Sequence, residues 1–236
     1  IDPVKIKILQ TEWDENLREG GRVFAVETDK AFHAIAPDSD WAFYIQADEI
    51  VHENTLDAVH QSMLRWKDDK RVEGLLCDFI HFYGSYGYVA NAYNWHRREV
   101  RIIRNDRNIF SYNDSMGFRK KPNEKLHVKH SGGTIYHYSY VKPPERMLTK
   151  AKEMDKRWHP DEVVEQKYEG IQEFDYSKID SLQPFAGTHP QVMQARVNAQ
   201  NWDFTHDPSR NYLRPKYRKI RSEEHTSELQ SPCNLV

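Results

Sequence analysis

A short apolar strand that ends in two adjacent carboxylates constrains this chain most. The strand pattern covers residues 41–46, which include Trp, Phe, Tyr and Ile, and Asp48 and Glu49 follow it almost at once. A run of this length and composition is typical of a buried strand. Carboxylates just beyond such a strand lie where open α/β sheets bind their ligands. The pair is therefore either a solvated turn or a site for Mg²⁺ or Mn²⁺, which take oxygen ligands.

Alternating strand and helix patterns surround this segment. Period-2 alternation predicts a strand over residues 4–8, and a one-sided apolar pattern predicts a helix over residues 23–35. Further along the chain we expect helices over residues 55–67, 145–158 and 191–201, and strands over residues 74–82, 100–104 and 134–138. Residues 83–95 are rich in Gly, Tyr and Asn, and we expect an irregular loop there. The β-α-β-α-β order of the first part favours an α/β fold with a largely parallel sheet.

The composition is that of a globular protein with a polar surface. The 236 residues suffice for one large domain or two small ones. Charged residues make up 30% of the chain, and the 12% of aromatic residues excludes a disordered protein. No apolar run is long enough to predict a membrane span. We expect a cytoplasmic protein, with peripheral contact at the inner face of the membrane left open.

Residues 221–236 resemble a translated sequencing adapter, with an ordinary polar tail as the alternative. They hold one Arg and three Glu, so the 34 basic and 36 acidic residues of the chain become equal in number without them. A net charge near zero argues against a nucleic-acid partner. Removal of Cys233 leaves Cys77 alone in an apolar strand, where we expect an inert side chain and no disulfide. We expect this tail to contact no core.

Residues 41–53 resemble the "W-hydrophobic-D-A-D-E" segment of family 2 glycosyltransferases, which have the GT-A fold. The resemblance includes residues 18–22, 101–105, 114–119 and 135–140 and spans roughly residues 1–160 in order. It implies a GT-A-like, partial Rossmann-type domain with helices on both faces of a largely parallel sheet, whose first strand is expected upstream of Ile1. Residues 161–220 would form a helical C-terminal extension. Gln46 departs from the pattern, because the family usually has an acid there.

The resemblance implies an enzyme of polysaccharide biosynthesis. Such an enzyme transfers a sugar from a nucleotide-sugar donor to a glycan or lipid-linked acceptor, with inversion and with a divalent metal, Mg²⁺ or Mn²⁺. Two other interpretations remain open. A catalytically degenerate relative would bind sugar or a protein partner without turnover, which Gln46 favours. A metal-dependent hydrolase would use the same acids and a histidine.

Three residues are expected around the metal. Transfer requires that the leaving diphosphate be neutralised, and one or two carboxylates with a cation meet that need. The resemblance assigns Asp48 and His137 to the metal and places Glu49 beside it as a further catalytic acid. A hydrogen-bonded packing residue is the alternative for His137.

The acceptor hydroxyl must also lose a proton, for which inverting enzymes use a carboxylate. The resemblance points to Asp114, while its Asn-Asp sequence is equally typical of a turn. Glu99 and Asp106 are the other candidates.

Arginines are expected to bind the donor, because a guanidinium binds phosphate through two hydrogen bonds. The candidates for this contact are Arg18, Arg22, Arg104 and Arg119. Alternate residues of a strand face opposite sides, so Arg101 and Arg104 are not expected to point inward together. Most of the basic cluster over residues 97–104 is therefore expected to be solvated.

Overall fold

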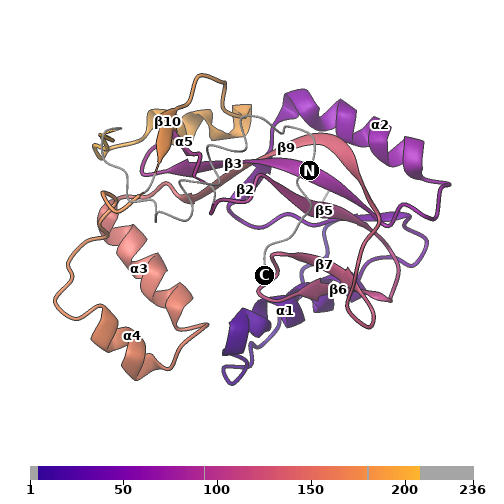
Figure 1. Cartoon of the computed structure of the whole chain (residues 1–236), viewed down its shortest axis with the longest axis horizontal. Coiled ribbons are helices and arrows are strands. Elements are labelled where there is room, and N and C mark those ends of the chain that lie inside the picture. The colour runs from indigo at the N-terminus through magenta and orange to yellow at the C-terminus, as the bar shows by residue number, and fades with distance from the viewer. Residues whose placement is uncertain (1–4, 93, 180, 208–236) are drawn as a thin grey trace.

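A mixed β-sheet forms the centre of the structure (Figure 1). A computed structural model describes residues 5–92, 94–179 and 181–207. Within them the central sheet contains β1 (Trp41–Phe43), β2 (Glu49–Val51), β3 (Gly74–Tyr83), β4 (Tyr88–Ala90), β5 (Arg98–Arg104), β9 (Val128–Tyr140) and β10 (Leu182–Pro184). A small second sheet contains β6 (Ile109–Tyr112), β7 (Gly117–Lys120) and β8 (Glu124–Lys125). The tail over residues 221–236 lies outside the described residues.

Helices flank the central sheet. They are α1 (Arg22–His33), α2 (Leu56–Trp66), α3 (Pro144–Asp155), α4 (Asp161–Lys167) and α5 (Gln194–Asn198), with short 3₁₀ turns η2 (Glu19–Gly21), η3 (Glu53–Thr55) and η4 (Gln191–Met193). None of these helices, within the part of the chain that the structure describes, has the length and apolar character needed to cross a membrane.

The central sheet is mostly antiparallel, so the expectation of a largely parallel, Rossmann-type sheet is wrong. β1 pairs with β5, β5 with β3, β3 with β4 and β4 with β10, each time antiparallel. β9 also pairs antiparallel with β2. Among the described strands, β3 and β9 alone pair in parallel.

For β1 and β3, the error concerns their neighbours rather than their direction. β1 and β3 flank α2 in the sequence and do run the same way, because each is antiparallel to β5. β5 arrives later in the chain and lies between them, so neither strand has the other as its hydrogen-bonding partner. A helical crossover predicts that two strands share a direction. It does not predict which later strand separates them.

Both faces of the sheet are buried. On one face, Val59 of α2 packs in a cluster with Leu75, Cys77 and Ile135. On the other, Phe32 of α1 packs with residues of β1, β5, β6 and β7. Burial raises the pKa of Cys77 to about 11, so this thiol is the inert core residue that we expected.

Two expected elements differ in the structure. Residues 5–10 form no strand: Ile6 is 54% and Ile8 81% exposed, and Val4 lies outside the described residues. The alternating pattern has no sheet to pack against there, which is the condition for strand formation. The irregular loop expected over residues 83–95 contains β4, because β10 supplies that strand with a second partner.

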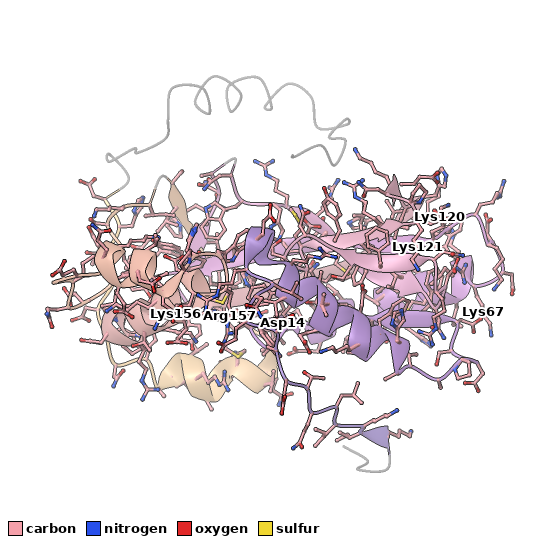
Figure 2. All side chains as sticks on the ribbon, turned by 90° about the horizontal axis from the view of Figure 1, so that it is seen from below. Asp14, Lys67, Lys120, Lys121, Lys156 and Arg157 are labelled. Atoms are coloured by element: carbon pink, nitrogen blue, oxygen red, sulfur yellow. The ribbon has the colours of Figure 1, made fainter. Side chains whose placement is uncertain are left out.

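Residues 157–161, which follow α3, contact the residues that precede α1. Arg18 Nη1 donates to the carbonyl oxygen of His159 at 2.9 Å and pairs with Asp161 at 2.5 Å. The guanidinium of Arg157 lies 5.3 Å from the ring centroid of Trp13. Figure 2 shows Arg157 close to Asp14, whereas Lys67, Lys120 and Lys121 lie in the right half of the view. The chain before α1 is therefore held against the end of α3.

Gly21, at the junction of η2 and α1, has no room for a side chain. Its φ is +65°, and a Cβ there would lie 2.8 Å from Cβ of Asp114 and 2.8 Å from Cζ2 of Trp158. Gly20 has a similar φ of +62°, but no atom lies within 4 Å of its Cβ position. The sequence Gly20-Gly21 therefore combines one glycine needed for its backbone angle with one needed for close packing.

Gly21→Ala should destabilise the protein more than Gly20→Ala. Both substitutions place an L-residue in the left-handed region, at a cost of about 1–2 kcal/mol. Gly21→Ala also forces Asp114 and Trp158 to move, which should cost a further ~1–3 kcal/mol. Urea unfolding of both variants measures the difference, and equal losses would contradict the packing described here.

Candidate functional site

Asp48 lies in the turn between β1 and β2, and β9 holds that turn in place. The Tyr138 amide donates to the Asp48 carbonyl oxygen at 2.9 Å. Lys150 Nζ of α3 donates to Asp48 Oδ2 at 2.8 Å, and His137 Nε2 lies 3.8 Å from Oδ1. Burial acts to raise the pKa of Asp48, but the Lys150 ammonium outweighs it and the pKa is lowered. Asp48 is therefore a charged carboxylate that Lys150 holds through Oδ2, with Oδ1 toward His137.

Lys150 is a site residue that the sequence patterns do not reveal. Its ammonium also donates to Ser139 Oγ at 2.7 Å and to the Ser139 carbonyl oxygen at 3.3 Å, so its position is well defined. Burial, with the nearby Lys150 charge, lowers the pKa of Lys142. The one available signal is Pro143-Pro144, which starts α3 directly after β9 and so brings the first turns of this helix to the end of the strand.

Glu49, expected to be catalytic, forms a buried ion pair. Arg101 of β5 donates from Nη2 to Oε1 at 2.8 Å and from Nε to Oε2 at 3.1 Å, and the exposed fractions of Glu49 and Arg101 are 5% and 2%. The Gln46 amide donates to the same Oε2 at 3.2 Å. Arg101 also donates to the carbonyl oxygen of Met116 at 3.2 Å. This pair therefore joins the β1–β2 turn to the β6–β7 turn.

Gln46 adds no charge to the site. Its side-chain amide donates to the Tyr44 hydroxyl at 3.0 Å. Since Glu49 is neutralised by Arg101, Asp48 is the carboxylate of this turn that remains available to a ligand.

Buried His81 and partly buried His137 form a hydrogen-bonded pair. They are partners in the parallel register of β3 and β9, and their Nδ1 atoms are 2.8 Å apart. His81 Nε2 lies 2.8 Å from the carbonyl oxygen of His96. Burial lowers the pKa of His81 to about 3, that of His96 to about 2, and that of His137 below its ordinary value. All three rings are therefore neutral at neutral pH.

Asp48 Oδ1 and His137 Nε2 are the atoms best placed to hold a cation. Their separation of 3.8 Å is shorter than the sum of two metal–ligand bonds of about 2.1 Å each, so one ion can contact both. Among the described residues, no group of three or more His, Cys, Asp or Glu side chains is arranged to hold a metal. The donors thus fit a cation that completes its coordination with substrate phosphates and water, as Mg²⁺ commonly does. Lys150 opposes any cation bound there without such an anion.

Asp114 lies in the tight turn between β6 and β7. Its neighbours Asn113 and Ser115 both have positive φ, 53° and 66°. Ser115 Oγ lies within hydrogen-bonding distance of Thr28 Oγ1 at 2.5 Å and donates to the Phe24 carbonyl oxygen at 3.1 Å, which fixes the turn to α1. Burial raises the pKa of the Asp114 carboxyl. A partly buried carboxylate with a raised pKa is a better base than an ordinary one.

Glu99 lies two residues before Arg101 on β5. Burial raises the pKa of Glu99 to about 7, although Arg101 opposes the shift, and the charges of Glu49 and Asp114 add to it. Its Oε2 is 3.3 Å from the position of a Cβ on Gly117, in the strand that follows Asp114. The structure thus places Glu99 and Asp114 in one acidic group.

Glu99→Gln should stabilise the protein at alkaline pH. Because the folded pKa of Glu99 is raised from 4.5 to about 7, the parent's stability from this group is complete below 4.5 and is lost as the pH rises through 7. Glutamine does not ionise, so at alkaline pH the free energy of unfolding of the variant should exceed that of the parent by at most about 3 kcal/mol. Thermal unfolding at pH 5 and pH 8 measures it. A stability difference between variant and parent that does not change between the two pH values would contradict the assignment.

The four arginines expected to bind the donor have different surroundings. Arg18 is paired with Asp161, and Arg22 is exposed at the start of α1. Arg119 stacks on Tyr112, with 4.8 Å between its guanidinium carbon and the ring centroid. Arg104 is 7% exposed and donates to the carbonyl oxygens of Trp66, Lys67, Asp69 and Val72, at and beyond the end of α2. Among the described residues, no interaction joins any of these four arginines to Asp48 or His137.

Comparison with known proteins gives no family assignment. No protein-family model matches the chain, and no curated protein matches it.

Proposed function

We propose that this chain is a glycosyltransferase that moves a sugar from a nucleotide-sugar donor to the hydroxyl of a glycan or lipid-linked acceptor, with inversion and with a divalent cation. The observation that carries the proposal is the state of Asp48. One of its oxygens is held by Lys150, and the other faces a histidine nitrogen 3.8 Å away. A cation and a diphosphate are the ligands that such a mixed group of charges would bind together.

The residues around Asp48 would bind the leaving diphosphate. A divalent cation, when bound, would neutralise negative charge on the phosphates, and Asp48 and His137 would hold it. Lys150 would bind a phosphate oxygen on the side away from His137, because its ammonium is already positioned by Ser139 and Asp48. Lys142 would add a second positive charge nearby. These cations would stabilise the diphosphate as its bond to the sugar breaks.

Asp114 would act on the acceptor. The acceptor oxygen would form its bond to the anomeric carbon as the diphosphate leaves, and the hydroxyl proton would pass to the Asp114 carboxylate. Gly21 lies against Asp114, because a Cβ on Gly21 would be 2.8 Å from the Asp114 Cβ. Arg101 supports the arrangement, since it contacts both the turn that contains Asp114 and the carboxylate beside Asp48.

Asp48→Asn should remove the dependence of donor binding on metal. An amide keeps the shape of the side chain but loses the charge that attracts the cation, so Mn²⁺ should no longer increase donor affinity, a loss of roughly 10–100-fold. Calorimetric titration of uridine- and guanosine-diphosphate sugars, with and without Mn²⁺, measures this. Asp40→Asn is the control, because Asp40 pairs with Lys67 at 3.1 Å on the surface. An unchanged metal dependence in Asp48→Asn, with circular dichroism like that of the parent, would refute the proposal.

The same assays separate the two other interpretations. Release of free sugar from the donor without an acceptor would favour a hydrolase. Metal-dependent donor binding with no transfer to any acceptor would favour a degenerate relative, for which the uncharged Gln46 is the supporting feature.

A further inference from the structure

A chain of hydrogen bonds runs from the backbone through His81 to His137. A carbonyl oxygen accepts hydrogen bonds and never donates them, so the 2.8 Å contact with the His96 carbonyl places a proton on His81 Nε2. His81 is 3% exposed, and the rings of Phe79, Trp95 and His96 pack around it. This burial disfavours a charged imidazole, and the two hydrogen-bond partners of the ring, the His96 carbonyl and the His137 ring, supply no negative charge. His81 is therefore neutral, with a lone pair on Nδ1.

That lone pair determines where the proton of His137 lies. The two Nδ1 atoms are 2.8 Å apart, which is a hydrogen-bonding distance and requires one proton between them. Since His81 Nδ1 carries none, His137 Nδ1 donates. A neutral His137 with its proton on Nδ1 has a lone pair on Nε2, the atom that faces Asp48 Oδ1 at 3.8 Å.

We infer that His81 is a positioning residue: by accepting a hydrogen bond from His137 Nδ1, it holds the Nε2 lone pair of His137 toward Asp48, where it can bind a cation. The inference rests on the proposed function for its role, while the position of the proton is a property of the free protein. Carboxylates and carbonyls commonly orient metal-binding histidines in this way. Here a second histidine does so, oriented in turn by a backbone carbonyl.

Nitrogen-15 NMR of the histidine-labelled full chain tests the position of the proton directly. At pH 7.5 the Nε2 resonance of His137, assigned from its absence in His137→Gln, should have the chemical shift of an unprotonated ring nitrogen. Its Nδ1 should have that of a protonated one. A protonated Nε2 in the parent protein overturns the inference, whatever the protein binds.

Two substitutions at His81 separate its hydrogen bond from its packing. His81→Phe keeps a ring but removes the acceptor, so the His137 proton should redistribute toward Nε2 and Mn²⁺ affinity in the presence of uridine diphosphate should fall 10–100-fold. His81→Asn loses the ring but places an acceptor oxygen near the position of Nδ1, and should keep both the tautomer and most of the affinity. Affinity that survives in a folded His81→Phe, or falls equally in both variants, overturns the inference.

The two proposals fail in different ways. If the parent has the expected tautomer but does not bind Mn²⁺ with or without uridine diphosphate, the proposed function fails and the proton assignment stands. If the parent binds Mn²⁺ with a protonated His137 Nε2, the proposed function stands and the role given to His81 is wrong.

Discussion

Arg101→Met should lower the free energy of unfolding by about 3–5 kcal/mol, the cost of leaving one partner of a buried ion pair uncompensated. The Glu49 carboxylate would lose its partner in a place that is 5% exposed, with the backbone amide of Gln46 still donating to it. The Met116 carbonyl would lose its guanidinium donor as well. The stacking of the guanidinium on Phe79, 4.8 Å from the ring centroid, would also be lost.

Arg98→Met is a matched control on the same strand. Arg98 also pairs with a carboxylate at 2.8 Å, that of Asp78, but its side chain is 59% exposed, so this substitution should cost less than about 1 kcal/mol. Urea unfolding, monitored by circular dichroism, compares the two variants. The double variant Glu49→Leu/Arg101→Met should recover part of the loss, because no buried charge then remains unpaired. Equal losses of unfolding free energy for Arg98→Met and Arg101→Met would show that the buried ion pair contributes no more to stability than the exposed one.

The burial of Arg101 and Arg104 shows what strand patterns leave out. Residues 97–104 contain a dense group of arginines, which in isolation favours a solvated surface. Arg101 is the extra residue of an irregularity in β5, where Leu75 and Leu76 pair with Ile102 and Val100, so regular alternation does not hold there, and both Arg101 and Arg104 are buried. Arg101 finds the carboxylate of Glu49, and Arg104 finds backbone carbonyls beyond α2. Every residue has a backbone carbonyl, so no sequence motif shows which carbonyls will accept hydrogen bonds from an arginine.

The sequence predicts the parts of the candidate site that depend on residue types. It does not predict the parts that depend on which strands and helices lie side by side in the fold. Asp48 and His137 were expected to meet, and the β2–β9 pairing brings them within 3.8 Å. Lys150 and His81 were missed, because a lysine in a helix and a histidine in a strand are most often simple surface and core residues. Their roles arise from the parallel register of β3 and β9 and from the position of α3. The order of strands in the sheet was missed for the same reason.

The acidic group of Asp114 and Glu99 leads to the last prediction. Asp114→Asn should slow sugar transfer by roughly 10²–10⁴-fold, the usual contribution of a general base, while donor affinity changes little. The carboxylate lies in a turn held to α1 through Ser115, so the amide should keep the same position and lose only the ability to take a proton. Burial raises the pKa of Asp114, which strengthens it as a base when it is ionised.

Two comparisons make this test specific. Asp106→Asn should transfer sugar at the parent rate, because Asp106 is exposed and its carboxylate accepts from the Asn108 amide in a surface turn. Glu99→Gln should lower the rate less than tenfold and change its pH dependence, since it removes a neighbouring carboxyl whose pKa is about 7. Single-turnover rates with a saturating donor measure all three variants. If Glu99→Gln loses the larger factor and Asp114→Asn does not, the base is Glu99, and Asp114 serves only to raise the pKa of that carboxyl.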